Sequence, residues 1–122
     1  MDLKPLEVKK DNRGSLIEAF KFPSDGQLFY IIANPNETRG HHYHTRKTEH
    51  FLVIYGSATM HVRDRETDNT MKVETSGSKP MVITVTPNNT HAITATNEGA
   101  IMLVWVDEQY DEKDPDTIPE EV

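Results

Sequence analysis

The sequence predicts an all-β fold, an antiparallel β-sandwich or barrel. About ten short segments rich in β-branched and aromatic residues follow one another at regular spacing, with turn-forming residues between them. Along the chain, the apolar residues do not recur with the 3.6-residue period of an amphipathic helix. With 122 residues, the chain fits one domain that buries about two-thirds of the surface its unfolded form exposes. We therefore expect a single domain over residues 1–122, ending in an acidic tail over residues 107–122.

The first third of the chain alternates predicted strands with clear turn signals. Strands are expected at residues 4–10, 16–22 and 27–33, and turns at residues 11–15, 23–26 and 34–36. The turns contain Asp, Asn, Gly and Pro, because Asp and Asn bond to their own backbone, Gly supplies positive φ and Pro fixes φ. The third strand, Gln-Leu-Phe-Tyr-Ile-Ile-Ala, has the strongest strand composition of the three.

The rest of the chain continues the same alternation up to the acidic tail. Strands are expected at residues 39–44, 49–55, 58–63, 71–75, 81–86, 91–96 and 100–109, and turns at residues 45–48, 56–57, 64–69, 76–80, 87–90 and 97–99. Pro115 and Pro119 interrupt the tail, and proline has no amide hydrogen to give to a sheet. The tail is therefore expected to stay out of any central sheet and to wrap the surface.

The last predicted strand is apolar on both faces. Alternate residues of a strand point to opposite sides, so Ile101, Leu103 and Trp105 share one face and Met102, Val104 and Val106 share the other. One face covers the core of a sandwich, and the other needs a second cover. The simplest cover is a second copy of the chain, so we expect a homodimer.

The net charge of −7 is confined to the tail. Residues 107–122 hold eight acids and one base, whereas the other 106 residues carry twelve of each. The body is therefore neutral, and Arg13, Arg39, Arg46 and Lys47 are free to hold a phosphate group.

Several functional classes are excluded by composition. The absence of cysteine removes disulfides, zinc fingers and thiol redox motifs. The longest uninterrupted apolar run, residues 100–106, is far shorter than the roughly 20 residues that span a bilayer, and no signal segment precedes it. No stripe of Lys and Arg with interleaved aromatics indicates nucleic acid. We expect a cytoplasmic protein that binds neither membrane nor nucleic acid.

The segment from Gly40 to Gly56 holds four of the six histidines. His42 and His44 are two residues apart, so on a strand their imidazoles project from one face. Glu49 follows a polar turn that brings the next strand back alongside. Two imidazoles and a carboxylate form a ligand set suited to Zn, Fe, Mn, Ni or Cu.

A His-x-His pair in a strand is more often an exposed polar pair than a metal site. The downstream Pro-x-x-x-His turn, which ends at His91, supplies a candidate fourth ligand and favours the metal site. His41 and His50 alternate to the opposite faces of their strands, and His61 stands apart. These three are expected to be bystanders.

The spacing His-x-His-x4-Glu-x6-Gly, which runs from His42 to Gly56, resembles the first metal motif of the cupin family. Residues 86–91 resemble the second motif, which contributes His91. Asn36 and Asn88 stand where the family patterns have glycine, and asparagine tolerates a left-handed backbone better than most residues. The resemblance implies a cupin-type double-stranded antiparallel β-helix, a jelly roll, with His42, His44, Glu49 and His91 as metal ligands.

A finer resemblance concerns small cupins of bacterial sugar-nucleotide metabolism. It rests on Asp11-x-Arg13-Gly14 with Glu18, and on Arg39-Gly40 before the ligand histidines. The closest similarity is to the C-terminal cupin of two-domain capsular-polysaccharide enzymes that reduce and epimerise UDP-2-acetamido-2,6-dideoxyhexoses. The segments that carry it are Glu49-x-Phe51-Leu52-Val53, the Pro-x-x-x-His turn, and Trp105 followed by Asp114-Pro115-Asp116-Thr117.

This resemblance implies a zinc-bearing epimerase that acts at C3 of a nucleotide-linked 4-keto sugar, without the reductase domain. Epimerisation needs two proton carriers. Lys47 and Tyr43 are candidates by proximity in sequence, although Tyr43 alternates away from the ligand face. His42 is a third candidate, because metal-free 3,5-epimerases use a base histidine at the matching position. The residues expected to bind substrate are Arg13, Glu18, Arg39 and Arg46, with the three arginines placing the diphosphate.

Two other functions stay open on the sequence. An iron-dependent cupin dioxygenase would use the same ligand set to activate O2, and a non-catalytic cupin would bind a sugar or effector. The sequence does not rank the metals. The resemblance favours zinc, with iron, nickel or manganese as alternatives.

Overall fold

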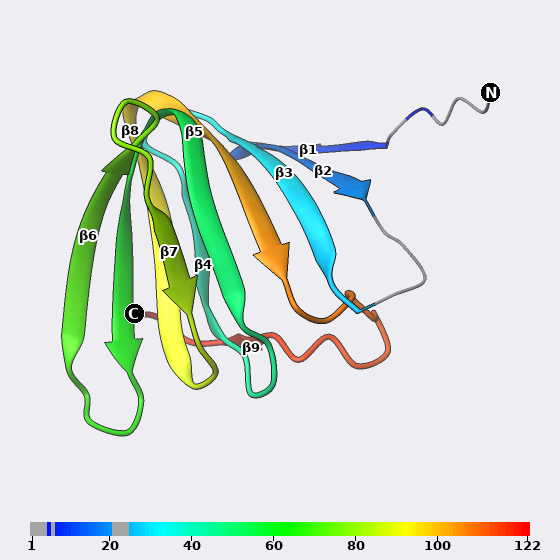
Figure 1. Cartoon of the computed structure of the whole chain (residues 1–122), viewed down its shortest axis with the longest axis vertical. Coiled ribbons are helices and arrows are strands. Elements are labelled where there is room, and N and C mark those ends of the chain that lie inside the picture. Colours follow the sequence, from blue (N-terminus) through cyan, green and yellow to red (C-terminus); the bar gives the residue numbers. More distant parts are fainter. Residues whose placement is uncertain (1–4, 6, 21–24) are drawn as a thin grey trace.

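The computed structural model describes residues 5, 7–20 and 25–122, and within these residues the chain forms nine β-strands and no helix (Figure 1). The strands are β1 Val8–Asp11, β2 Gly14–Phe20, β3 Gln27–Ala33, β4 Thr38–Tyr43, β5 Glu49–Asp64, β6 Thr70–Ser76, β7 Val82–Val85, β8 Asn89–Val106 and β9 Ile118–Pro119. All their pairings are antiparallel. The part of the chain that the structure describes contains no helix long and apolar enough to span a bilayer.

Two long strands, β5 and β8, form the central ladder of the fold. They pair from Glu49 opposite Val106 to Asp64 opposite Asn89. The first half of β5 also pairs with β7 and its second half with β6, while the matching halves of β8 pair with β3 and β4. Each long strand therefore belongs to two sheets, which curl around a common interior. The all-β, cupin-type jelly roll predicted from the sequence is confirmed.

The predicted turns at residues 56–57 and 97–99 are bends within continuous strands. The β5–β8 register shifts between Val53 and Tyr55 and again between Gly56 and Ala58. Gly56 and Gly99 both have a φ of 73°, a left-handed conformation that favours glycine. These glycines bend the long strands from one sheet into the other instead of reversing the chain.

Asn88 takes the left-handed conformation expected of it, and Asn36 takes the same conformation. Asn36 has a φ of 64° and Asn88 a φ of 63°. Both therefore supply the left-handed backbone that each turn requires.

The N-terminal predictions are partly tested. The strand expected at residues 4–10 begins at Val8 in the structure, and the strand expected at 16–22 is β2, which begins earlier. Residues 4, 6, 21 and 22, and the first two residues of the turn expected at 23–26, lie outside the described residues.

The core lies between the two sheets. Met102, Val104 and Val106 of β8 point into it, and the largest fully buried apolar side chains are Met60 and Met102. The other face of β8 points outward, and Trp105 on it is 41% exposed. On this outer face, residues that pair in register on neighbouring strands form one apolar row. The row consists of Ile17, Tyr30, Leu103, Leu52 and Val82.

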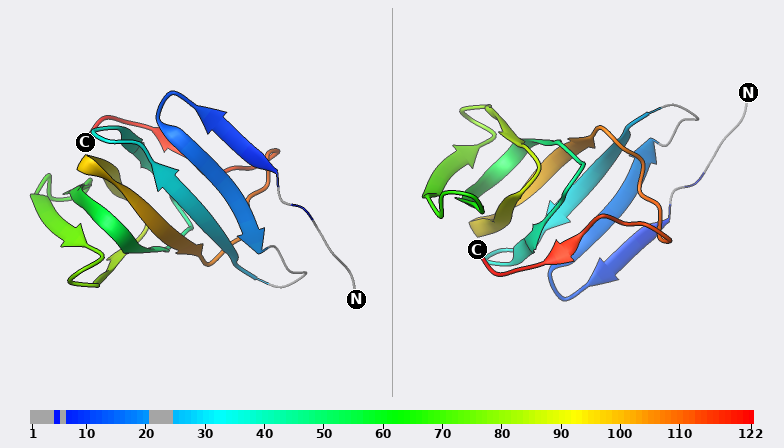
Figure 2. Two further views of the ribbon diagram at one scale, coloured as in Figure 1. Left: turned by 90° about the horizontal axis from the view of Figure 1, so that it is seen from above. Right: turned by 90° about the horizontal axis from the view of Figure 1, so that it is seen from below.

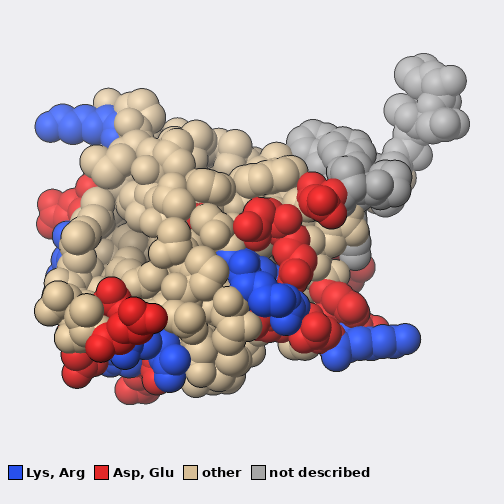
Figure 3. All heavy atoms as spheres, turned by 60° about the horizontal axis from the view of Figure 1, so that its bottom comes forward, with Lys and Arg blue, Asp and Glu red and all other residues tan. Residues whose placement is uncertain are grey.

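The C-terminal segment crosses the end of the sandwich where β4 stops and β5 begins (Figures 1 and 2). Its two-residue strand β9 pairs with the edge of β4, so the tail stays out of the central ladder as expected. Carboxylates gather with a few basic side chains on this side of the molecule (Figure 3).

Candidate metal centre

The four predicted ligands come together between the two sheets. His42 is in β4 and lies opposite His91 of β8 in the register of one sheet. His44 follows the end of β4, and Glu49 is the first residue of β5. One ligand atom from each of the four lies within 4.8 Å of the others. Adjacent strands and one short turn are enough to assemble the cluster.

The ligand atoms are close to one another but not hydrogen bonded. The Nε2 atoms of His44 and His91 lie 2.8 Å and 3.0 Å from Oε1 of Glu49. All three atoms are buried and have no hydrogen-bond partner. Buried polar atoms in proteins are nearly always partnered. Three of them that converge on one point are the expected arrangement of a metal ligand set.

The second ring nitrogens of two ligands are held by backbone carbonyls. Nδ1 of His44 lies 2.6 Å from the carbonyl oxygen of Asp116, and Nδ1 of His91 lies 3.0 Å from that of Asn89. A carbonyl oxygen can only accept, so each Nδ1 carries the hydrogen. Each Nε2 is therefore left with a lone pair directed at the cluster.

The protonation states suit a divalent cation. Burial, and then the nearby His91 and His44, lowers the pKa of His42 to about 4. Burial opposes the charging of His44, but Glu49 and the carbonyl of Asp116 outweigh it and raise its pKa. Burial would raise the pKa of Glu49, yet the imidazoles of His44 and His91 hold it well below its usual range. At neutral pH the carboxylate is charged and His42 is neutral, as metal ligation requires, whereas the raised pKa of His44 means that a cation has to displace a proton from this imidazole.

A cavity of about 420 Å³ opens beside the four ligands, which form part of its wall. Its other walls are largely apolar, and they include Leu16, Phe29, Phe51, Ile93, Val104 and Val106. A cavity of this size suits a small molecule, and its apolar walls limit the water around a bound group.

One part of the cavity lining is cationic. The side chain of Arg39 lines the cavity, and its Nε and Nη2 are buried without a hydrogen-bond partner. Burial, and then the charge of Arg13, lowers the pKa of Arg39. Arg13 donates to Asp11, with Nη2 and Oδ2 2.7 Å apart, and also lines the cavity. Glu18 lines the same region and lies 3.5 Å from the ammonium of Lys9. The unpartnered guanidinium makes this region a candidate site for an anionic group.

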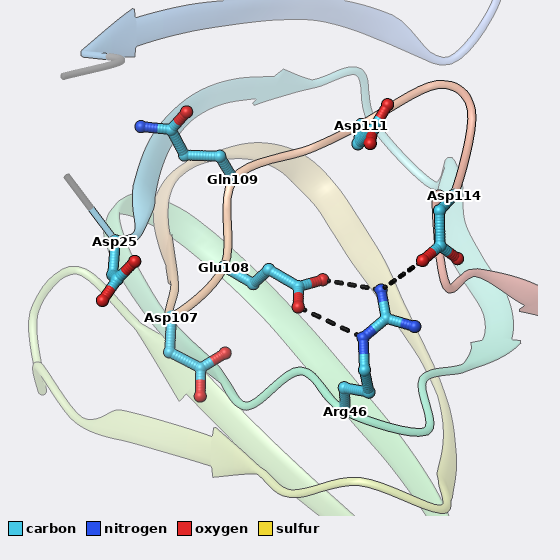
Figure 4. Close-up of a pocket in the computed structure, with 7 residues that line it drawn as sticks. All are labelled: Asp25, Arg46, Asp107, Glu108, Gln109, Asp111 and Asp114. Carbon is cyan, nitrogen blue, oxygen red and sulfur yellow. Dashed lines mark hydrogen bonds and ion pairs between the residues drawn. The ribbon is translucent and has the colours of Figure 1, made fainter. Parts of the chain in front are cut away.

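Arg46 lies apart from Arg13 and Arg39. Its guanidinium donates to both carboxylate oxygens of Glu108, at 3.1 Å and 2.9 Å, and lies 3.4 Å from Asp114 (Figure 4). These residues border a second, open hollow of about 520 Å³, which shares Glu108 with the cavity. Its remaining lining residues are Asp25, Asp107, Gln109 and Asp111. The structure does not bring the three predicted arginines together.

Lys47 and Tyr43 take different positions. Lys47 is buried, lines the cavity and donates from Nζ to the carbonyl oxygen of Pro115 at 2.8 Å. Tyr43 is not among the residues that line the cavity, and its ring lies 3.8 Å from the guanidinium carbon of Arg65. The alternation along β4, which already counted against Tyr43, accounts for this position.

Sequence reasoning missed Tyr110, which lines the cavity. The ammonium of Lys47 is 5.5 Å from the centre of its ring. The buried Gln27 holds this part of the chain by accepting a 2.8 Å hydrogen bond from the backbone amide of Tyr110. The sequence placed Tyr110 in the acidic tail, and no local pattern indicates that the tail returns to the site.

Two curled antiparallel sheets that enclose three imidazoles and a carboxylate define a cupin with a metal-type ligand set. Within that class, the chain belongs to the polysaccharide biosynthesis C-terminal domain family, whose model matches residues 9–118. The predicted resemblance to the cupin of the capsular-polysaccharide enzymes is confirmed.

Individual proteins similar to this chain support its membership of the family. The UDP-2-acetamido-2,6-beta-L-arabino-hexul-4-ose reductase of Pseudomonas aeruginosa is 37% identical over 113 residues, 92% of this chain and 30% of that protein. The capsular polysaccharide assembling protein CapF of Staphylococcus aureus superposes with a TM-score of 0.92 at 34% identity, over 97% of this chain and 35% of its own. Oxalate decarboxylase of Bacillus subtilis superposes with a TM-score of 0.81 over 93% of this chain and 30% of its own. At 21% identity, that likeness concerns the fold. The chain spans about a third of the length of these relatives.

Proposed function

We propose that this chain is a metal-dependent epimerase of nucleotide-activated sugars. It would act beside the ketone of a nucleotide-linked 4-keto-6-deoxyhexose during surface-polysaccharide biosynthesis. The observation that carries the proposal is the cavity, which joins a buried metal-type ligand set to the unpartnered guanidinium of Arg39. The names of two relatives, a UDP-hexulose reductase and a capsular polysaccharide assembling protein, support the same substrate class.

The four ligand residues fit a divalent transition metal, and we propose zinc. Histidine nitrogens and carboxylate oxygens are both zinc ligands, and the buried, unpartnered ligand atoms match a cation site. Bound there, zinc would supply Lewis-acid polarisation of the substrate ketone. Iron, nickel and manganese accept similar ligands, so the metal has to be measured.

The residues of the chain would position the sugar nucleotide. Arg39, helped by Arg13, would hold the diphosphate, because a guanidinium matches phosphate geometry with paired hydrogen bonds. Glu18, in the same region, would accept hydrogen bonds from hydroxyl groups of the substrate. Arg46 would bind the diphosphate only after its ion pairs with Glu108 and Asp114 break, so we propose a smaller contribution of Arg46 to substrate binding.

Proton transfer is assigned to the side of the cavity where Lys47 lies. Epimerisation removes the proton next to the ketone and returns one to the other face of the ring, which requires two carriers. Lys47 and Tyr110 both line the cavity and lie close together, so either of them would serve as the carrier for the one face of the ring that is turned towards them. Tyr110 takes the part first considered for Tyr43. His42, the third candidate by resemblance, would hold the metal through its lone pair, so we assign it to the metal and not to proton transfer. The apolar walls would limit exchange with solvent water while the proton is off the sugar.

We also propose that the chain forms a homodimer through the outer face that carries Ile101, Leu103 and Trp105. The opposite side chains of β8 fill the core, and on this face Trp105 is exposed and Ile101 and Leu103 are half-buried among the described residues.

Deuterium exchange tests the reaction directly. The metal-loaded protein is incubated in D2O with a UDP- or dTDP-4-keto-6-deoxyhexose, and the sugar is analysed by NMR. Deuterium is expected at C3, and at C5 if both centres are substrates, without net oxidation or reduction. Arg39→Ala should raise KM at least tenfold, because it removes the proposed diphosphate contact.

Matched histidine variants serve as controls. His42→Ala should abolish exchange, whereas His50→Ala should retain it, because His50 contacts Thr84 on the outer face at 2.9 Å. No incorporation with several such sugars, from protein with a full metal site, would exclude the epimerase. Uptake of O2 by iron-loaded protein would instead favour the oxygenase.

A further inference from the structure

Asp116 of the tail is buried against the turn that carries the metal ligand His44. Its side chain is 3% exposed, which is rare for a carboxylate. The Arg46 guanidinium is 4.0 Å from Oδ1 of Asp116, too far for a hydrogen bond. The carboxylate instead accepts hydrogen bonds from the backbone amides of Thr45 and Arg46, at 3.0 Å and 2.8 Å, and from the Thr45 hydroxyl at 2.5 Å.

The same residue holds the imidazole of His44. The carbonyl oxygen of Asp116 is 2.6 Å from Nδ1 of His44. Its backbone φ of 48° is left-handed, which costs energy for a residue other than glycine. This conformation lets the side chain and the carbonyl of one residue reach the amides of the turn and the ring before it.

Burial alone would be unfavourable for the carboxylate of Asp116, and the hydrogen bonds from Thr45 and Arg46 compensate for it. The preceding residue adds a further contact, because the carbonyl of Pro115 accepts from Nζ of Lys47. The tail is thus bound to both ends of the segment from His44 to Lys47.

We propose that Asp116 is a positioning residue for the metal centre. Its carboxylate fixes the turn, and its carbonyl fixes the ring and the tautomer of His44, so that Nε2 presents its lone pair to the cation. Metal affinity then depends on a side chain that never touches the metal. The inference rests on the proposed metal site, but not on the proposed reaction.

Zinc affinity measures this role without reference to activity. Competition between the full chain and a chromogenic chelator at neutral pH gives the dissociation constant. Asp116→Ala should weaken zinc binding at least tenfold, because the turn loses its three donor contacts. Asp116→Asn should stay within about threefold of wild type, since the amide oxygen still accepts and its NH2 can donate to the Thr45 hydroxyl. The matched control is Asp114→Ala. This side chain is 68% exposed and pairs with Arg46, so zinc affinity should not change.

Two further measurements separate positioning from general stability. A purely structural role would lower the melting temperature of the zinc-free protein and leave zinc affinity intact, which would overturn the proposal. The absorption spectrum of the cobalt-loaded Asp116→Ala variant should also change, because one imidazole loses its fixed orientation. Thr45→Ala removes only the hydrogen bond from the Thr45 hydroxyl to Asp116, and this variant tests the proposal if Asp116→Ala does not fold. We expect zinc binding about threefold weaker in Thr45→Ala, and wild-type affinity would count against the proposal.

The outcomes distinguish this inference from the proposed function. Tight zinc binding that depends on Asp116, in a protein that exchanges no sugar proton, would support the inference and refute the epimerase. A wild-type chain that binds zinc no better than Asp116→Ala would refute the inference.

Discussion

At the scale of single residues, the candidate metal centre is arranged by groups outside the proposed ligand set. The carbonyls of Asp116 and Asn89 fix the tautomers of His44 and His91, and burial keeps His42 neutral. The ligand lone pairs therefore converge without reorganisation of the chain. A site prepared in this way should bind its cation with high affinity and lose most of that affinity when one ligand is removed.

The fourth ligand provides the sharpest residue-level test. His91→Ala should lower the metal content of the purified protein at least tenfold, because it leaves three donors and a gap in the coordination sphere. Elemental analysis of protein purified without added metal gives both the content and the identity of the metal. His61→Ala is the matched control, because His61 lies in the second half of β5 and outside the ligand cluster. Full occupancy in the His91→Ala variant would show that the fourth ligand has been assigned wrongly.

Three candidate ligands could be predicted from local spacing, because His42 and His44 lie two residues apart at the end of β4 and a short turn returns Glu49. The fourth, His91 of β8, could be predicted from the Pro-x-x-x-His motif. Tyr110 and Asp116 could not be predicted, because the tail that carries them contacts residues some seventy positions away, as Asp116 does with Thr45 and Arg46. The ion pairs of Arg46 with Glu108 and Asp114 have the same origin.

At the scale of elements, the bends of β5 and β8 determine the architecture. Gly-Ser and Asn-Glu-Gly are turn sequences by composition, and composition alone predicts chain reversals there. The same left-handed glycines also suit a bulge within a continuous strand. Strand pairing decides whether such a segment reverses the chain or bends a strand, and here β5 and β8 pair with each other on both sides of the bend. Such long-range pairing is not encoded in a local window.

Gly56 should therefore be sensitive to the smallest substitution. A Cβ on Gly56 would collide with the carbonyl oxygen of Gly99, and the φ of 73° is strained for alanine. We expect Gly56→Ala to lower the free energy of unfolding by about 2 kcal/mol or more. Urea denaturation at a fixed metal load measures the change.

The control for this variant is Lys72→Ala on the edge strand β6. Lys72 is exposed, so its removal should change the free energy of unfolding by less than about 0.5 kcal/mol. If Gly56→Ala were as stable as Lys72→Ala, the bend would not depend on the left-handed glycine.

At the scale of the whole molecule, the chain closes its site with its last residues. The tail crosses the end of the sandwich, supplies Tyr110 and Asp116 to the surroundings of the site and pairs with β4 through β9 (Figure 1). Its acidic residues account for the whole net charge of −7, and several of them bind basic residues of the body. The charge asymmetry seen in the sequence thus contributes to attachment of the tail.

The outer face of β8 is apolar, in contrast to the acidic tail, and it leads to a prediction about the oligomeric state. Leu103 lies between Tyr30 and Leu52 in the register of the sheet, at the middle of the apolar row. A wide apolar face of this kind is usually covered by a partner. The structure settles which face of β8 is available, because Met102, Val104 and Val106 are buried in the core.

Sedimentation of the wild-type chain at micromolar concentration should therefore show a dimer, twice the 13.9 kDa of one chain. Leu103→Lys should convert it to a monomer, because a charge at the centre of the interface would have to be buried without a partner. Met71→Lys is the matched control. Met71 is also apolar and 65% exposed, but it lies on β6, which belongs to the other sheet, so the dimer should persist. A wild-type chain that sediments as a monomer would exclude the second copy as the cover of this face.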